Sequence, residues 1–210
     1  MKKIIVGGCS HVFGHGLPDC IEGLTPSKLA WPALINREFG CEIINFSEPG
    51  NSCIKNVRSI QNFKDLTSVS AILILLPYSK RRVLKNGNEE YNFTCTTPNN
   101  SNKLWNTTFE RYQIYCHHDT TDDVNYLSYV GYLNYISLKY SIPLWLSGSV
   151  REDHELLQAH NFEVGMPDDW THYCYTNKFS TTPDGHYGAD AHLGLYRNYI
   201  KPWLLNKVFK

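Results

Sequence analysis

The sequence has no long apolar run, no excess of charge of either sign and no closely spaced pair of cysteines. No stretch approaches the roughly 20 apolar residues of a membrane span. The apolar run at the N-terminus ends at Gly7, well short of the roughly 7–15 residues of a signal peptide. The 20 basic and 20 acidic residues balance, so no net field favours a nucleic-acid partner. We therefore expect a cytoplasmic protein that binds neither membranes nor nucleic acid.

The seven cysteines are odd in number and scattered, and the chain has no CxxC pair. Neither a disulfide framework nor a zinc site is indicated, and buried free thiols are the preferred interpretation. His186, Asp190 and His192 are an alternative metal set, but nothing elsewhere completes it. We expect no metal and no cofactor.

Apolar β-branched runs alternate with amphipathic segments along the chain, which indicates the α/β class. This alternation predicts a parallel sheet with right-handed crossovers, covered on both faces in a three-layer α/β/α sandwich. The expected strands are Lys3–Val6, Glu42–Phe46, Ser70–Leu76, Ile142–Leu146 and a fifth within Asn161–Tyr175. The expected helices are Ser27–Phe39, a segment from a Ser52 cap to about Phe63, Asp122–Tyr140, Arg151–Ala159 and Ala189–Phe209, the last interrupted at Pro202.

At this length a single domain spanning residues 1–210 is the default. Periodicity disappears at about residues 85–121, a segment rich in Asn and Thr with interspersed aromatic residues. We interpret it as an irregular insertion with room for short strands, because the aromatic side chains need burial. Its His117-His118-Asp119 cluster is expected at the surface.

Two short motifs at opposite ends of the chain predict the chemistry. The first is Gly7-Gly8-Cys9-Ser10, where an apolar strand delivers a hydroxyl at its carboxyl end. Cys9 competes as a nucleophile, but alternation turns adjacent side chains to opposite sides, so only one of the two faces the cleft. The second motif contains Asp184 and His186, which can supply a base and its orienting carboxylate.

A third imidazole, His192, falls in the early turns of a helix that begins near Gly188. A loop histidine such as His186 is free to reach Ser10, whereas a helical one is more often packed, so His192 is the reserve base. Two neighbouring loops offer binding groups. Gly50 supplies a backbone N–H for a developing oxyanion and Asn51 a side-chain amide. Arg81 or Arg82 can hold an anion.

These residues resemble the SGNH/GDSL hydrolases, in particular divergent members encoded by bacteriophages. Gly8-Cys9-Ser10 resembles the first block of that family, Pro49-Gly50-Asn51 the second, and Asp184-Gly185-His186 followed by Ala191-His192 the last. The resemblance implies a flavodoxin-like, mostly parallel sheet of four to five strands. It assigns Ser10 as nucleophile, His186 as base and Asp184 as its partner, with the Gly50 N–H in the oxyanion hole.

The third block of the family, Gly-x-Asn-Asp, has no match here, since Leu76-Pro77-Tyr78-Ser79 stands in its place. Asn51 or Ser79 would then replace the missing amide, and Arg82 would contact substrate. The implied activity is a serine esterase or acylhydrolase acting on a small-molecule or carbohydrate ester, such as an O-acetylated sugar.

Several alternatives stay open. The same fold can serve an O-acyltransferase, a catalytically impaired ligand-binding protein or a virion-associated protein. The missing block and Cys9 favour the ligand-binding protein. A phosphate-handling protein is a weaker alternative, because Gly7-Gly8-Cys9-Ser10 lacks the Lys and the spacing of a P-loop. The sequence carries no signal for an oligomeric state.

Overall fold

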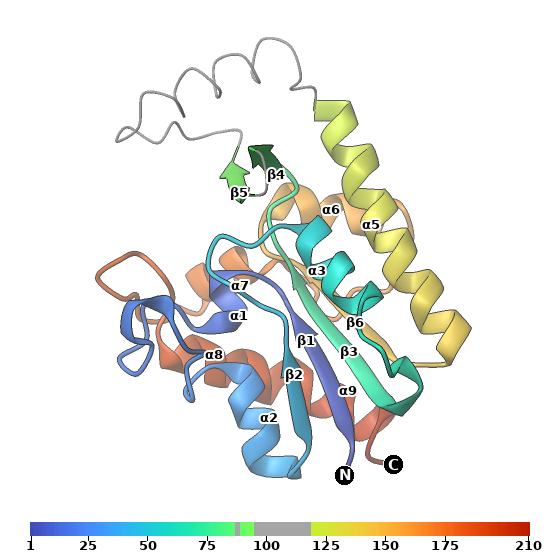
Figure 1. Ribbon diagram of the computed structural model, residues 1–210. Coiled ribbons are helices and arrows are strands. Elements are labelled where there is room, and N and C mark those ends of the chain that lie inside the picture. The colour runs from blue at the N-terminus through green and yellow to red at the C-terminus, as the bar shows by residue number, and fades with distance from the viewer. Residues whose placement is uncertain (87–88, 95–118) are drawn as a thin grey trace.

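The computed structural model describes residues 1–86, 89–94 and 119–210. Four parallel strands form the central sheet in the order β2-β1-β3-β6, seen edge to edge in Figure 1. The strands are β1 (Lys3–Gly7), β2 (Glu42–Asn45), β3 (Val69–Leu76) and β6 (Leu144–Gly148). The α/β class, the parallel sheet and the four recognised strands are thus confirmed, each to within two residues at its ends.

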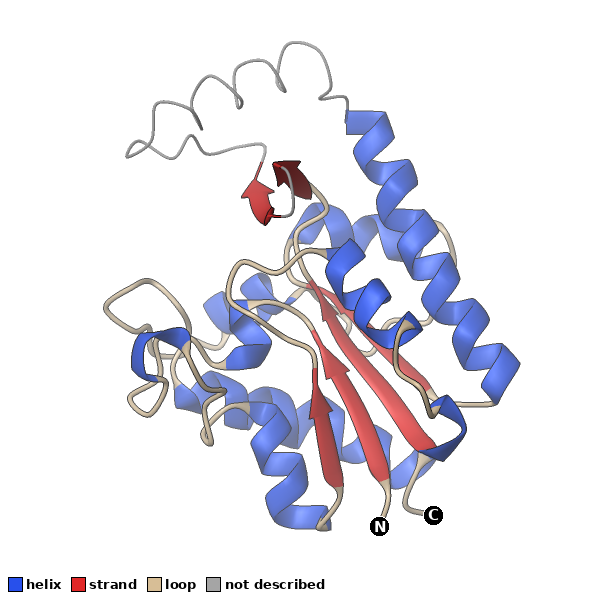
Figure 2. Ribbon diagram, in the orientation of Figure 1, coloured by secondary structure: helices blue, strands red, loops and turns tan. Residues whose placement is uncertain are grey.

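Helices cover both faces of the sheet (Figure 2). Alternation along β3 explains the two layers, since Leu73 and Leu75 pack in one core while Ile72 and Ile74 pack in the other. The first core is covered by α2 (Trp31–Phe39), α7 (Trp170–Thr176), α8 (Ala189–Leu195) and α9 (Lys201–Lys207). The second is covered by α3 (Cys53–Gln61), α5 (Asp119–Tyr140) and α6 (Arg151–Ala159).

The expected fifth strand within Asn161–Tyr175 is wrong. Gly165 makes one strand-like contact, donating its N–H to the Leu146 carbonyl at 2.6 Å. Pro167 follows and has no N–H with which to extend a ladder. The chain then enters α7, whose Trp170 is fully buried in the first core. The segment Asn161–Tyr175 therefore contributes apolar side chains to the core but does not form a strand.

The helix ends show how local sequence sets the boundaries. Gly40 caps α2 with φ of 59°, as its position predicts. The start of α2 lies at Trp31 and not at Ser27, because the Ser27 hydroxyl bonds Asp19 and keeps that turn outside the helix. Ser52 occupies the N-cap of α3, but its hydroxyl makes no capping bond.

The C-terminal helix is interrupted before Pro202. A π-helical turn, Tyr196–Ile200, joins α8 to α9. Proline lacks the N–H of a regular helical bond and its ring crowds the carbonyl one turn earlier, so a wider turn before Pro202 accommodates it. The expected break was correct and its position was one turn too late.

At the start of the predicted insertion, β4 (Arg81–Asn86) and β5 (Glu89–Thr94) form an antiparallel hairpin. Strand β4 begins before the predicted boundary, and β5 is a short strand inside it. Residues 95–118, including His117 and His118, lie outside the described residues, and α5 begins at Asp119, before the predicted end of the insertion. Over the described ranges, no helix has the length and apolar character needed to cross a membrane.

Candidate functional site

The loops that follow β1, β2 and β3 meet at the carboxyl edge of the sheet. Strand β1 lies between β2 and β3. The crossover from β1 to β2 passes through α2 on one face of the sheet, and the crossover from β2 to β3 runs the opposite way through α3 on the other face. Such a switch in winding direction opens a crevice at the strand ends, where open α/β sheets bind their ligands. Ser10, Gly50 and Ser79 come from these three loops.

Ser10 begins a single short helix, α1 (Ser10–Phe13), directly after β1. Gly8 makes this tight strand-to-helix turn possible, since its φ is 152° and an added Cβ would lie 2.2 Å from Val12 Cγ2. Ser10 is buried to 6% exposure, and Cys9 to 1%. The structure thus places the hydroxyl at the start of a helix above the sheet.

Asn56 of α3 holds this turn and was missed by the sequence analysis. Its Oδ1 accepts the Gly8 N–H at 2.8 Å, and its Nδ2 donates to the Ser52 carbonyl at 3.0 Å and to the Gly8 carbonyl at 3.4 Å. Asn56 is 1% exposed. A polar side chain on the inward face of α3, between Cys53 and Ile60, was the available signal.

Gly50 follows β2 in a left-handed conformation, with φ of 72° and open space around it. Glycine is needed there for its backbone angle and not for crowding. The neighbouring Asn51 is buried, and its amide spans its own loop. Its Nδ2 donates to the Phe46 carbonyl at 3.0 Å, and its Oδ1 accepts the Ser52 N–H at 2.9 Å. The amide of Asn51 therefore shapes the loop that carries Gly50.

The loop after β3 is fastened to two other elements. The Ser79 N–H donates to Asp153 Oδ2 of α6 at 2.8 Å, and Arg81 donates to the Asn51 carbonyl at 3.2 Å. Burial raises the pKa of Asp153 to about 6, against the opposing effect of its bonds to Ser79. Arg82 lies in β4 opposite Phe93, and its side chain is outside the described structure.

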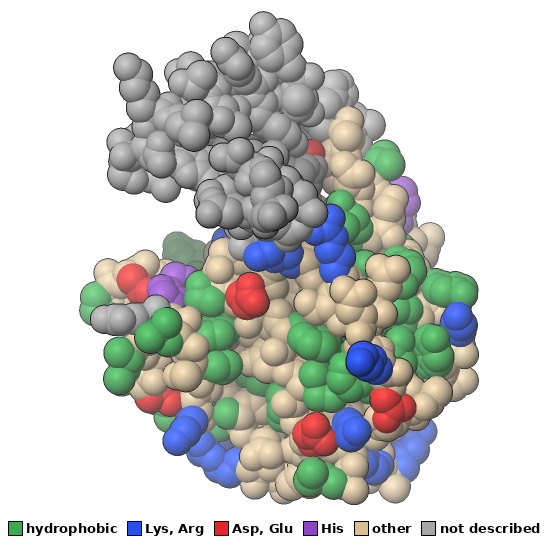
Figure 3. All heavy atoms as spheres, viewed as in Figure 1, with side chains coloured by type: hydrophobic (Ala, Val, Ile, Leu, Met, Phe, Trp, Pro, Cys, Tyr) green, Lys and Arg blue, Asp and Glu red, His purple; other side chains and the backbone are tan. Residues whose placement is uncertain are grey.

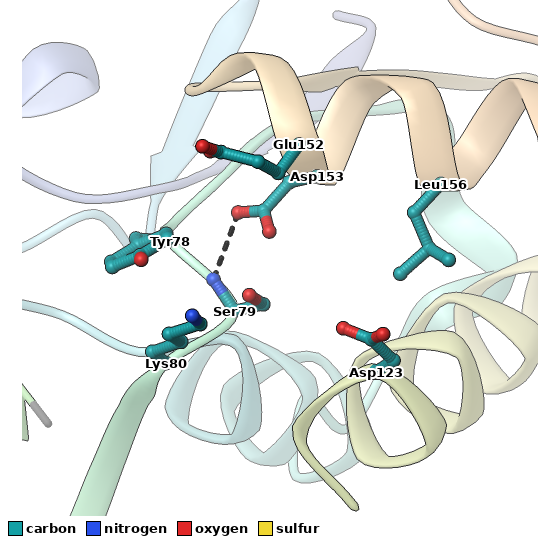
Figure 4. Close-up of a pocket in the computed structure, with 7 residues that line it drawn as sticks. All are labelled: Tyr78, Ser79, Lys80, Asp123, Glu152, Asp153 and Leu156. Atoms are coloured by element: carbon teal, nitrogen blue, oxygen red, sulfur yellow. Dashed lines mark hydrogen bonds between the residues drawn. The ribbon is translucent and has the colours of Figure 1, made fainter. Parts of the chain in front are cut away.

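Figure 4 shows a cavity of about 230 Å³ beside this tether. Carboxylates project toward it from α5 and α6, and the β3–β4 loop closes the other side. The lining residues are Tyr78, Ser79, Lys80, Asp123, Glu152, Asp153 and Leu156. Asp153 is another residue that sequence reasoning missed, because its role depends on a contact with a residue 74 positions away.

Asp184 and His186 lie in the loop before α8, as predicted. Asp184 Oδ2 is 3.1 Å from His186 Nδ1, although it lies off the line of the ring N–H. Such contacts commonly tighten when substrate binds. The Thr182 hydroxyl donates to Asp184 Oδ1, and this bond, followed by the backbone N–H and imidazole of His186, lowers the pKa of Asp184. The carboxylate is therefore ionised at neutral pH.

Imidazole rings bring the two ends of the chain together. His186 lies 5.5 Å from His11, the residue after Ser10, and 5.1 Å from His15, measured between ring centroids. Burial, then the charges of His186, His192 and Arg81, lower the pKa of His11 to about 3. Figure 3 shows histidine surface beside acidic surface at the left rim of this face. The predicted C-terminal pair thus lies next to the predicted nucleophile turn.

His192 has a packing role that sets it apart from His186. It is 2% exposed, and its Nδ1 accepts the N–H of Trp31, the first residue of α2, at 3.5 Å. Burial is the main cause that lowers the pKa of His192 to about 4. A neutral imidazole is required for this acceptor role, since it caps a helix N–H that has no partner within α2.

The alternative metal set of His186, Asp190 and His192 is not assembled. Asp190 accepts the backbone N–H and hydroxyl of Ser180 at 2.9 and 2.7 Å, and His192 faces Trp31. In the described part of the chain, no three His, Cys, Asp or Glu side chains are grouped to hold a metal ion.

Comparisons with solved structures identify the architecture. A lipase/acylhydrolase from Enterococcus faecalis is 13% identical with a TM-score of 0.56, the alignment covering 99% of this chain and 97% of that one. TesA is 10% identical with a TM-score of 0.58, covering 99% and 100%. The psychrotrophic esterase EstA from Pseudoalteromonas sp. is 11% identical with a TM-score of 0.57, covering 98% and 100%.

The carboxyl-edge turn of Asn56 and Gly8 generates one stability prediction. Asn56→Leu leaves the N–H of Gly8 and two backbone carbonyls without this partner, so the free energy of unfolding should fall by roughly 2–4 kcal/mol. Gln61→Ala, at an exposed position of the same helix, should change it by less than about 0.5 kcal/mol. Urea unfolding measures both. Equal midpoints for the two variants would show that the turn does not depend on Asn56.

The buried imidazole of His192 generates a pH prediction. Its folded-state pKa lies below the unfolded value, so only the unfolded chain takes up a proton as the pH falls from 6.5 toward 4. Stability should therefore fall over this window, by on the order of 3 kcal/mol from His192.

His192→Asn keeps an acceptor near the Nδ1 position and removes the titration. Thermal unfolding against pH should be flatter over that window for this variant than for the wild type. His160→Asn, at an exposed position, should follow the wild type. An unchanged acid slope in His192→Asn would contradict the assignment.

No protein-family model and no curated protein matches the chain. The solved structures do match over nearly its full length, and at their low identities the likeness is one of fold. The chain has the α/β fold of the SGNH/GDSL lipases and acylhydrolases.

Proposed function

We propose that the protein is a serine ester hydrolase of the SGNH type, with Ser10 as nucleophile, His186 as general base and Asp184 as the partner of His186. One observation carries the proposal: the Asp184–His186 pair lies against the turn that presents Ser10, with the His186 ring 5.5 Å from the His11 ring and tilted against it by 60°. The full-length likeness to esterases and acylhydrolases supports it.

In this mechanism His186 Nε2 takes the proton of the Ser10 hydroxyl, and Ser10 Oγ attacks the ester carbonyl. Asp184 fixes the tautomer of His186 by facing Nδ1 and stabilises the imidazolium that forms. His186 then returns the proton to the leaving alcohol. Water attacks the acyl-enzyme with the same base, and release of the acid restores Ser10.

The backbone N–H groups of Ser10 and Gly50 are the donors assigned to the oxyanion. Asn51, Ser79 and Arg82 are the substrate-side residues of the proposal. Asn51 and Ser79 come from the loops after β2 and β3, and Arg82 comes from β4. The side chains of Asn51 and Asp153 bind backbone groups. Asn51 holds the loop of Gly50, and Asp153 holds the loop of Ser79. Loss of one oxyanion donor costs roughly two to three orders of magnitude in turnover.

The substrate of the proposal is an acyl ester of a small molecule or carbohydrate. One structural neighbour with a TM-score of 0.50 and 13% identity is described as a carbohydrate esterase whose active site displays divergent catalytic and non-catalytic binding functions; it covers 98% of this chain and 65% of that one. We further propose a single domain, acting in the cytoplasm. The bacteriophage kinship that the sequence resemblance implies stays a prediction.

A ligand-binding protein without catalysis is the second candidate function. The segment Leu76-Pro77-Tyr78-Ser79 replaces the family block that supplies an oxyanion amide, and Cys9 stands beside the nucleophile. An O-acyltransferase would use the same acyl-enzyme with an acceptor alcohol in place of water. Trapping of an acyl-enzyme would separate the ligand-binding protein, which forms none, from the ester hydrolase and the O-acyltransferase, which both form one.

A phosphonate probe tests the proposal, in keeping with a relative whose structure was also determined with monoethylphosphonate as inhibitor. A fluorophosphonate should label the wild type and should not label Ser10→Ala. Labelling of His186→Ala should be at least about 100-fold slower, since the general base is lost. Peptide mapping by mass spectrometry should place the adduct on Ser10.

Cys9→Ala is the matched control and should label at the wild-type rate, because its side chain is buried and the hydroxyl is retained. Hydrolysis of p-nitrophenyl acetate and longer acyl esters gives the turnover readout. A wild type that reacts with no phosphonate and hydrolyses no ester would refute the hydrolase and leave the binding protein.

A further inference from the structure

We propose that His15 is a positioning residue that shares the carboxylate of Asp184 with His186, an inference that rests on the proposed hydrolase function. His15 Nε2 lies 3.6 Å from Asp184 Oδ2, the same oxygen that lies 3.1 Å from His186 Nδ1. The two rings meet edge to face, with an interplanar angle of 76°. Asp184 thus stands between two imidazoles.

The loop that carries His15 is shaped to reach this carboxylate. Gly14 ends α1 with φ of 77°, which turns the chain back toward the Asp184 loop. Gly16 has φ of 83°, and a Cβ there would lie 2.4 Å from Asp184 Oδ1 and 2.7 Å from Thr182 Oγ1. Only glycine permits that backbone angle together with this close approach. In Figure 1 the loop after α1 and the loop before α8 lie side by side.

The far side of the His15 ring is also enclosed. Its Nδ1 is buried and has no hydrogen-bond partner among the described residues. An added Cβ on Gly23, in the short 3-10 helix Ile21–Gly23, would lie 3.0 Å from that nitrogen. The ring is therefore confined between this helix and the Asp184 loop, and its Nε2 lies 3.6 Å from Asp184 Oδ2.

Confinement matters because Asp184 is a surface carboxylate. Its side chain is 39% exposed, while those of His15 and His186 are 33% and 23% exposed. Thr182 holds Oδ1, and His15 and His186 face Oδ2 from two sides. At 3.6 Å the contact of His15 Nε2 with Oδ2 is longer than a hydrogen bond. A hydrogen bond that forms when this contact tightens limits rotation of the carboxylate and shares its charge. Both effects act on His186, whose Nδ1 depends on the same oxygen.

The consequence for the reaction is a defined orientation and basicity of His186. Without His15 the carboxylate is freer to rotate, so the productive geometry is populated less often and turnover falls. The carboxylate then acts on His186 alone, which favours the imidazolium that forms during the reaction. A residue that only fills space would produce neither a basicity change nor a recovery with a polar substitute.

His15→Ala, His15→Gln and His186→Ala, with exposed His160→Ala as control, test the role. In His15→Ala, kcat on an acetyl ester should fall roughly tenfold with little change in KM, and the acid limb of kcat/KM should move up by roughly half a pH unit. His15→Gln, which keeps an N–H donor, should recover most of kcat. His186→Ala should lose roughly 100-fold or more.

A second measurement is independent of turnover. NMR titration of the His186 ring protons, assigned with His186→Ala, should show the same upward shift in His15→Ala and a smaller one in His15→Gln. Gly16→Ala keeps His15, but its Cβ displaces the carboxylate from both imidazoles, so this variant should not show the upward shift.

The outcomes separate the two proposals. If the wild type hydrolyses no ester, the function fails, but the titration of His186 still decides whether His15 acts on Asp184. Unchanged kcat and unchanged titration in His15→Ala overturn the positioning role. A loss in His15→Gln as large as in His186→Ala also overturns it, because His15 would then be the base itself.

Discussion

The buried bond between Asn56 and the Gly8 N–H is the contact on which the arrangement at the carboxyl edge depends. It ties α3, which packs on one face of the sheet, to the turn from which Ser10 emerges above the opposite face. Gly8 has no room for a side chain, and its N–H is too deep for water to satisfy. The asparagine therefore combines a hydrogen-bond requirement with a geometric one, and the position of Ser10 follows from both.

A second constraint comes from the chain ends. The loop before α8 has few bonds to the sheet itself, and it is held by short polar contacts: Ser180 with Asp190, and Thr182 with Asp184. His192 fixes the helix that follows by capping α2 from across the interface. This division separates the two histidines of one motif. His192 supports the packing of α2 and α8, while His186 stays partly exposed beside His11, the residue after Ser10.

The parts of the fold that could be predicted are those set by local sequence. The apolar run Ser-Ala-Ile-Leu-Ile-Leu-Leu, in a chain where strands alternate with helices, is typical of a buried strand. Gly40 marks the end of a helix because glycine readily adopts the left-handed conformation. The segment Asn161–Tyr175 was different, because its apolar residues fill the core from a loop and a short helix. Whether an apolar segment joins a sheet depends on the space beside β6, which no local pattern encodes.

The same distinction holds for the candidate site. Asp184 and His186 could be recognised as a candidate pair because they lie two residues apart in one loop, which is a local relation. Asn56 and Asp153 could not, since they contact residues 48 and 74 positions away. Long-range partners of this kind leave only an oddity in the sequence, such as an asparagine on an apolar helix face.

The departure from the family pattern after β3 has a physical counterpart in this structure. The third block of the SGNH/GDSL hydrolases, which the other motifs resemble, carries an amide at this position. Here the loop of Ser79 is instead held by Asp153 of α6 and linked by Arg81 to the Asn51 carbonyl of the neighbouring loop. The loops after β2 and β3 are therefore coupled through a charged group. In the proposed mechanism, a movement of the Gly50 N–H during acyl transfer is coupled to Arg81, so the proposed oxyanion site depends on both loops.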